Sequence, residues 1–269
     1  MNIRHSAVAG TFYPDSCDEI NRYINRFNEV LDDAAFDPES ELFPRAIISP
    51  HAGYIYSGFT ANMAFRTAAF NNPKVKRVIV IGPSHRAYID GASIALYDAY
   101  QTPCAELKID LELSRRVEAA YGFLHFSPDA HSEHSTEVQM PFIQHYFPHA
   151  EVIEIVYGQM DFMKISDLID DLLRDEDNFI VISTDLSHFY TKSEAKTLDT
   201  ICLSAIQNLD LQQFDKGCEA CGMIGVKAMI NSAITQNLRS SLLDYRTSAD
   251  TTGDESNVVG YTSALLGTS

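Results

Sequence analysis

Long apolar stretches are absent from this sequence. No segment reaches the roughly 18 consecutive apolar residues that a membrane-spanning helix needs. The amino-terminal residues also lack the apolar core of a secretory signal peptide. These two absences argue against a membrane partner and predict a soluble, cytoplasmic protein.

Basic residues are scarce. Lys and Arg number 20 against 37 Asp and Glu, which gives a formal net charge of −17. A surface of that sign repels nucleic-acid backbones, so we expect no nucleic-acid partner. Glycine-rich phosphate-binding loops are also missing, and nothing in the sequence supports nucleotide binding.

Cysteine is present in an odd number and at irregular spacing. The five residues are Cys17, Cys104, Cys202, Cys218 and Cys221. This pattern favours reduced thiols over a disulfide framework, which agrees with a cytoplasmic location. Cys104 is expected to be a small buried side chain and not a ligand.

Three apolar runs without polar alternation are present, and each ends shortly before a histidine. Residues 46–49 precede His51, residues 77–81 precede His85, and residues 179–183 precede His188. Such runs are typical of central strands that helices cover on both faces. Helical patterns at residues 58–70 and 165–174 predict strand, helix, strand units, with the first two histidines on neighbouring parallel strands. With 269 residues and 45% hydrophobic content, we expect one α/β domain over residues 1–269.

The three histidines are expected at one edge of this sheet, because ligands gather at the carboxyl ends of parallel strands. One histidine in this position is explained equally well as a structural residue. Three in the same context favour a metal site or an acid/base site, since imidazole serves both roles.

A polar segment before residue 142 is expected to lie beside this edge. Thr136 and Gln139 resemble a capping box, which would place Glu137 in the first turn of a helix and His134 at its start. Two interpretations remain open: His134 and Glu137 either cap and orient other groups, or take part directly.

Cys218 and Cys221 stand before a second apolar helix at about residues 222–230. A thiol at a helix amino terminus has a lowered pKa and is readily a metal ligand or a nucleophile. A redox pair of Cys218 with Cys221, and chance spacing of two buried cysteines, are the alternatives. Further on, residues 242–254 are polar and precede a last strand at residues 258–266.

Six short motifs resemble those of the Memo family, whose microbial members are called AmmeMemoRadiSam system protein B. They lie at residues 9–14, 49–58, 82–85, 133–137, 183–188 and 221–222, and they span nearly the whole chain. The resemblance implies a three-layer α/β/α sandwich around a mostly parallel mixed sheet, as in class III extradiol dioxygenases.

The resemblance also implies a set of functional residues. It assigns iron or copper binding to His51, His85 and Cys221, and it places Asp185 and His188 in the same pocket as proton-handling groups. Four further residues of these motifs are expected to line or support the pocket: Tyr54, Ser84, His134 and Glu137.

Three functions follow from this resemblance. The first is a metal-dependent redox protein or oxidoreductase that works with AMMECR-type and radical-SAM partners. The second is an extradiol-type non-haem iron dioxygenase, in which Cys221 stands where the carboxylate ligand is expected and His188 resembles the acid/base. The third is a non-catalytic module that binds a peptide or a partner in the same pocket.

Overall fold

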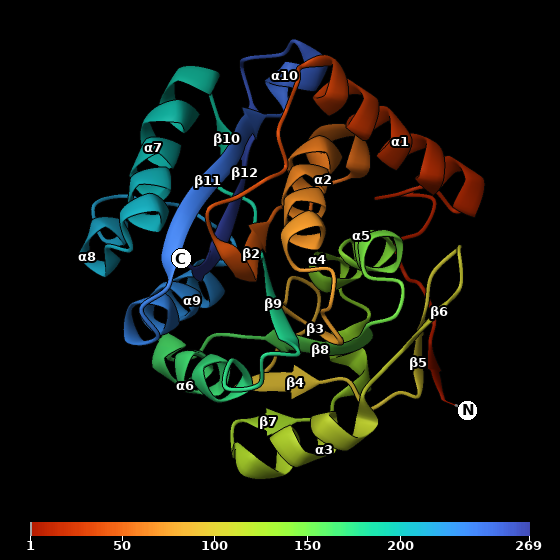
Figure 1. Cartoon of the computed structure of the whole chain (residues 1–269). Coiled ribbons are helices and arrows are strands. Elements are labelled where there is room, and N and C mark those ends of the chain that lie inside the picture. Colours follow the sequence, from red (N-terminus) through yellow and green to blue (C-terminus); the bar gives the residue numbers. More distant parts are fainter. Residues whose placement is uncertain (1) are drawn as a thin grey trace.

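A nine-stranded mixed sheet forms the centre of the computed structural model, which describes residues 2–269 (Figure 1). The strands follow the order β10-β12-β2-β9-β3-β8-β4-β7, and β11 pairs with β12 beside this path. Their bounds are β2 (Phe43–Ser49), β3 (Arg77–Pro83), β4 (Ala92–Ile94), β7 (Leu124–His125), β8 (Glu151–Tyr157), β9 (Asn178–Ser183), β10 (His188–Tyr190), β11 (Arg239–Thr247) and β12 (Val258–Thr268). The sheet is parallel in its centre, from β2 to β8, and the strands next to this centre, β12 and β4, pair antiparallel with it, while β7 pairs in parallel with β4.

The strands that precede His51, His85 and His188 lie side by side, as predicted. β9 pairs in parallel with β2 on one side and with β3 on the other. The prediction that the first two histidines follow directly adjacent strands is wrong, because β9 lies between β2 and β3. The connection from β2 to β3 passes over the position that β9 occupies. A strand, helix, strand pattern in the sequence does not show whether such a position is left between the two strands.

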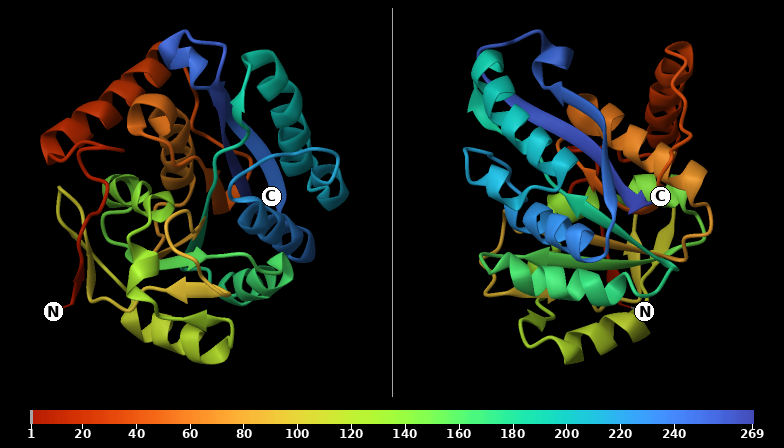
Figure 2. Two further views of the ribbon diagram at one scale, coloured as in Figure 1. Left: turned by 180° about the vertical axis from the view of Figure 1, so that it is seen from behind. Right: turned by 60° about the vertical axis from the view of Figure 1, so that its left-hand side comes forward.

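Helices cover both faces of the sheet (Figure 2). Along β2, Ile47 faces the apolar layer that contains α1, α2 and α5, whereas Ile48 faces the layer that contains α3, α6, α7 and α9. This burial on both faces explains why the strand sequences do not alternate. The helices are α1 (Cys17–Asp33), α2 (Tyr54–Asn71), α3 (Leu111–Ala120), α4 (His134–Glu137), α5 (Met140–Tyr146), α6 (Phe162–Leu172), α7 (Lys192–Asn208), α8 (Leu211–Phe214), α9 (Met223–Thr235) and α10 (Ala249–Thr252). The predicted three-layer α/β/α sandwich is confirmed.

The amino-terminal arm, residues 2–16, lies beside a second, smaller sheet. That sheet has the order β1 (Ile3–Arg4), β5 (Ala99–Gln101) and β6 (Glu106–Lys108). A disulfide between Cys17 and Cys104 joins the start of α1 to the turn between β5 and β6.

Four of the five cysteines form disulfides, so the expectation of reduced thiols is wrong. Cys17 pairs with Cys104, and Cys202 pairs with Cys218. Cys104 is therefore not a simple packing residue, and Cys218 does not form a redox pair with Cys221, which is free. The bonded cysteines are 87 and 16 residues apart in sequence. Folding brings the two cysteines of each pair together, and their spacing in the sequence does not predict the pairing.

Strand β11 was not predicted from the polar segment at residues 242–254. It pairs along its length with β12, and most of its side chains are half-buried. A strand with one covered face needs few strongly apolar residues, and the sequence therefore resembles a loop.

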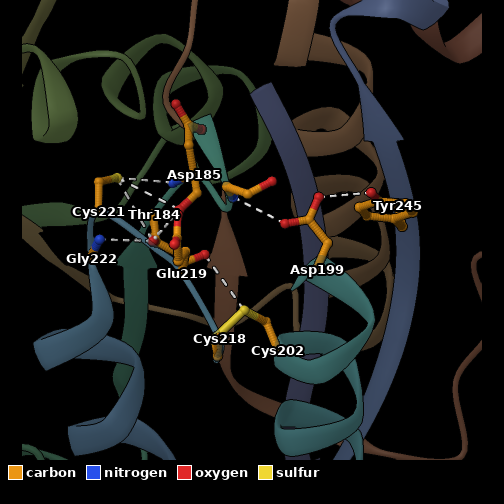
Figure 3. The surroundings of a disulfide bond; sticks show 10 residues. Thr184, Asp185, Asp199, Cys202, Cys218, Glu219, Cys221, Gly222 and Tyr245 are labelled. Carbon is orange, nitrogen blue, oxygen red and sulfur yellow. Dashed lines mark hydrogen bonds between the residues drawn. A yellow bond between two sulfur atoms is a disulfide. The ribbon is translucent and has the colours of Figure 1, made fainter. Parts of the chain in front are cut away.

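Hydrogen bonds join the loop after β9 to β12 and to α7. Gly260 of β12 accepts a hydrogen bond from the Leu186 N–H and donates one to the Ser187 carbonyl. The Asp199 carboxylate of α7 accepts from the Ser187 N–H and from the Tyr245 hydroxyl (Figure 3). A Cβ at position 260 would lie 2.0 Å from Asp199 Oδ2, so this approach requires glycine.

No helix within residues 2–269 is both long and apolar enough to cross a bilayer.

Candidate metal centre

The candidate residues lie at the carboxyl edge of the parallel strands. His51 follows β2 and precedes α2, His85 follows β3, and Asp185 follows β9. Cys221 lies two residues before the first residue of α9. Parallel strands all end at one edge, and the loops that follow them converge there.

His51, His85 and Cys221 each present one donor atom, and these atoms all lie within 4.8 Å of one another. His51 Nε2 and Cys221 Sγ are 3.3 Å apart. Tetrahedral geometry at ordinary metal–nitrogen and metal–sulfur lengths separates such a pair by about 3.5 Å. The same separation lets the thiol donate an S–H···N hydrogen bond to His51 when no cation is bound.

Hydrogen bonds determine which nitrogen of His51 carries the proton. Nδ1 lies 2.9 Å from Ser183 Oγ. The Ser183 hydroxyl donates its single proton to the Ser135 carbonyl, 2.5 Å away, so it can only accept from His51. Nδ1 therefore holds the hydrogen, and Nε2 keeps a free lone pair on the side of Cys221. An imidazole oriented in this way is prepared to bind a metal through Nε2.

Gln139 fixes the Ser183 hydroxyl in turn. Its amide nitrogen donates to Ser183 Oγ and to the Pro50 carbonyl, both at 2.9 Å. Its amide oxygen accepts from the Ser49 hydroxyl at 2.9 Å. A flipped amide would place its oxygen against the Pro50 carbonyl, so only one orientation satisfies all three contacts.

The capping box predicted at Thr136 and Gln139 is not formed. Helix α4 begins at His134, two residues before Thr136, and Glu133 caps it. The Thr136 hydroxyl donates instead to the buried carboxylate of Glu154 at 2.5 Å.

Glu133 has a positioning role that the sequence did not indicate. One carboxylate oxygen accepts from the N–H groups of His134 and Ser135, and the other accepts from those of His85 and Arg86. Burial alone would raise the pKa of Glu133, but hydrogen bonds from His134 and His85 hold it well below its usual range. The ionised carboxylate therefore joins the His85 loop to α4. The feature of the sequence that points to Glu133 is its position directly before a histidine that begins a helix.

The imidazole rings that meet at this edge belong to His51, His85 and His134. The ring centroid of His134 lies 4.8 Å from that of His85 and 5.4 Å from that of His51. His85, Glu133 and His134 also bring donor atoms within 4.8 Å of one another. Because Glu133 already accepts four backbone hydrogen bonds, this second set offers a metal fewer free lone pairs than the set with Cys221.

Asp185 contacts His51 directly. Its Oδ1 accepts from the His51 N–H at 2.8 Å, and its Oδ2 lies 3.9 Å from His51 Nε2. His188 begins β10 and is half-buried, and its ring contacts Phe189. Within residues 2–269, no hydrogen bond or ion pair joins His188 to the other candidate residues. Its role stays a prediction.

The Cys221 thiol faces the loop after β9, on the opposite side of its own loop from the Cys202–Cys218 disulfide (Figure 3). The Asp185 N–H donates to Cys221 Sγ at 3.2 Å. Burial and the nearby Asp185 carboxylate raise the pKa of the thiol to about 12. The prediction of a lowered pKa is therefore wrong, because these two effects exceed that of the nearby helix end.

The pKa of His51 is also shifted so that its uncharged form is favoured. Burial lowers the pKa of its imidazole to about 4, although Asp185 opposes this shift. Both groups are uncharged at neutral pH, so a thiolate–imidazolium pair is disfavoured. This argues against a cysteine nucleophile activated by His51, which needs that pair.

Glu137, Tyr54 and Ser84 occupy three different surroundings. The buried carboxylate of Glu137 accepts from Arg4 Nη1 at 2.5 Å and from the Tyr13 hydroxyl at 2.7 Å. It also accepts from the N–H groups of Ala7 and Val8, so the amino-terminal arm engages both of its oxygens. Tyr54 is buried and stacks on Phe142 in the core. The Ser84 hydroxyl donates to the Ala87 carbonyl.

A hollow of about 540 Å³ adjoins the donor atoms. His85 and Cys221 lie in its wall, whereas His51 does not. The full lining is Pro83, Ser84, His85, Ala87, Tyr88, Ile89, Tyr157, Gly158, Gln159, Ala220, Cys221, Met223 and Ile224.

The profile of a protein family described as "Memo-like protein" matches residues 4–265. The chain belongs to the Memo family. An Aquifex aeolicus "MEMO1 family protein" is 33% identical over 274 residues, which cover 97% of this chain and 98% of that protein. MEMO1 family proteins of Methanosarcina mazei and Methanosarcina acetivorans are 31% and 32% identical, and both alignments cover 99% of this chain and 100% of the relative.

The residues that match the Memo family profile include every residue of the candidate centre. The matched residues 4–265 include the histidines at the strand ends, Cys221, and the arm residue Arg4 that contacts Glu137. The similarity is therefore one of whole chains and not of an isolated motif.

Replacing Glu137 with Gln should destabilise the protein by about 3–5 kcal/mol, because Arg4 then keeps a buried charge without its partner. Urea unfolding at neutral pH measures the change. Glu106→Gln is the matched control, since Glu106 is exposed on β6 and makes no side-chain hydrogen bond or ion pair in the described chain. Equal stability of the two variants would show that the carboxylate does not hold the arm.

Replacing Ser183 with Ala should release the Nδ1 hydrogen of His51 from its acceptor. Nitrogen-15 NMR of the metal-free protein should then show a mixture of the two neutral imidazole forms in place of one. Metal affinity should fall about 10- to 100-fold, as is typical when a group that orients a ligating histidine is lost.

Ser263→Ala is the control for this change, because the buried Ser263 hydroxyl has no hydrogen-bond partner among residues 2–269. It should alter neither the His51 spectrum nor metal affinity. An unchanged His51 spectrum in Ser183→Ala would contradict the assigned proton position.

Proposed function

We propose that this Memo-family protein is a metal-dependent redox protein that holds iron or copper through His51, His85 and Cys221. The observation that supports this most is the convergence of their three donor atoms within 4.8 Å. The Ser183 contact adds to it, because His51 Nε2 is left free to bind on the side where Cys221 lies.

The chemistry of the donors fits a bound cation. Within residues 2–269, neither a Lys nor an Arg hydrogen bonds to Cys221, and none is among the main causes of the shift in its pKa. A thiol becomes a thiolate when a positive charge lies beside it, and a metal ion supplies that charge. Without a cation, the site holds a buried neutral imidazole and a partly buried neutral thiol close to the Asp185 carboxylate.

Two imidazoles and one thiolate form a donor set that suits iron and copper. Thiolate is a soft ligand that favours Cu(I) and iron, while imidazole accepts either metal. When bound, such a metal supplies one-electron chemistry. The chain itself orients His51 through Ser183, holds the His85 loop through Glu133, and keeps Asp185 and His188 as the proposed proton-handling groups.

Extradiol ring cleavage is less well supported than redox chemistry. A thiolate in place of the carboxylate ligand lowers the Lewis acidity available for binding a catechol dianion. Cooperation with AMMECR-type and radical-SAM proteins belongs to this proposal and rests on the family resemblance. A non-catalytic peptide- or partner-binding module would have no need of the free Nε2 lone pair.

Single substitutions test the three ligands. His51→Ala, His85→Ala and Cys221→Ser should each weaken metal binding at least about 100-fold, because each removes one of three protein donors. Anaerobic calorimetric titration with Fe(II) and with Cu(I) provides the measurement. Cys221→Ser should weaken Cu(I) binding more than Fe(II) binding, since serine oxygen is a hard donor.

The matched control is the double variant Cys202→Ser/Cys218→Ser. It removes two sulfur atoms near Cys221 and should leave the ligand set complete, with affinity within about threefold of the parent. If the three ligand variants bind metal as tightly as the parent, these residues are structural and the proposed function is wrong.

Metal affinity should rise with pH. Binding displaces the Cys221 proton, and the pKa of that thiol is about 12, so the logarithm of the affinity should increase by about one for each pH unit between about pH 7.5 and pH 9.5. His51 adds nothing to this slope, because burial lowers its pKa to about 4. Competition titrations against a chelator of known pH dependence measure it.

Cys221→Ser should remove most of this slope while the weaker binding remains measurable. A parent protein whose affinity does not change over that pH range would contradict the assignment of Cys221 as a ligand.

A further inference from the structure

The hollow beside His85 and Cys221 is walled by apolar and neutral polar groups. Ile89 and Ala87 come from the segment after His85, while Met223 and Ile224 belong to the first turn of α9. A volume of about 540 Å³ lies within the usual range for sites that bind small molecules.

Charged side chains are absent from this wall. Asp, Glu, Lys and Arg make up 21% of the sequence, yet none of the thirteen lining residues is one of them. Four other hollows of the surface each include at least two charged side chains. The hollow at the candidate metal centre therefore departs from the rest of this acidic surface.

Most of the polar groups in the wall are already occupied. The Tyr157 hydroxyl donates to the Gly222 carbonyl and accepts from the Gly225 N–H. The Ser84 hydroxyl donates to the Ala87 carbonyl. The side-chain amide of Gln159 is exposed and makes no hydrogen bond in the described chain. It is therefore a neutral group that can still bind a ligand.

We propose that this hollow admits an uncharged small molecule that carries a lone-pair donor for the metal proposed at His51, His85 and Cys221. This inference rests on the proposed function and names the substrate class of the same site. Its apolar groups lie against Ile89, Met223 and Ile224, and the Gln159 amide offers one neutral hydrogen bond.

Anionic ligands are disfavoured for two reasons. The proposed metal can compensate only a group bound directly to it, and no lysine or arginine among the lining residues compensates a carboxylate or phosphate that leaves water elsewhere in the hollow. The Asp185 carboxylate beside His51 and the net charge of −17 also repel an anion as it approaches.

A matched pair of metal-binding probes tests the charge preference. The full-length protein is loaded with Co(II), whose absorption spectrum reports on its ligands, and is titrated with 4-phenylimidazole and with 4-(imidazol-4-yl)benzoate. The neutral probe should shift the spectrum and bind at least about tenfold more tightly than the carboxylate, because only the carboxylate brings an unpaired charge into the hollow. Equal affinities, tighter carboxylate binding, or no spectral change with the neutral probe would overturn the proposal.

Two variants locate the binding. Ala87→Trp fills the hollow from a half-buried position and should reduce affinity for the neutral probe at least about tenfold while Co(II) still binds. Gln159→Lys places a cation at an exposed part of the wall and should bring the two probes within about threefold of each other. Unchanged binding of both probes in both variants would show that the hollow is not the ligand site.

Failure of this inference is distinct from failure of the proposed function. If Co(II), Fe(II) and Cu(I) all fail to bind the parent, the metal centre itself is refuted. If Co(II) binds and the probes show no preference for the neutral molecule, only the substrate class is refuted.

Discussion

The Ser183 hydroxyl is the contact on which the candidate centre depends. It lies at the end of β9, between the strands that precede His51 and His85, and it joins His51, Gln139 and the Ser135 carbonyl. Ser135 and Gln139 belong to the turn around α4, whereas His51 follows β2, and the hydroxyl has one proton and two acceptor positions for these three partners. The position of one hydrogen therefore sets the orientation of the candidate ligand His51 relative to α4.

The turn of α4 extends this control to the rest of the site. Glu133 at its start holds the loop of His85, Gln139 just beyond it holds Ser183, and Glu137 at its end holds the amino-terminal arm. The arm returns to the site, because Phe12 lies against the His134 ring with their centroids 4.5 Å apart. Buried carboxylates of this kind are stable only when hydrogen bonds compensate them, and here those bonds come from segments far apart in sequence. One short turn thus connects the first residues of the chain with the candidate metal ligands.

The sequence predicts the sheet centre and its functional edge well, because apolar runs and the histidines after them are local features. It places His51 and His85 at one edge, and the structure brings their donor atoms together with that of Cys221. It does not reveal the disulfides, the position of β9, or the contacts of Gln139, since these depend on which distant segments meet. The Cys221 pKa was predicted in the wrong direction for the same reason: the helix end is visible in the sequence, but burial and the Asp185 carboxylate are not.

The Cys202–Cys218 disulfide closes a loop of 16 residues that ends three positions before Cys221. Closing a loop of this length removes about 3 kcal/mol of conformational entropy from the open chain. The segment that contains the candidate ligand Cys221 is therefore tethered to α7 at one end and enters α9 at the other. Unfolding of the segment around Cys221 is therefore restricted by a covalent bond between two cysteines that lie outside the candidate ligand set.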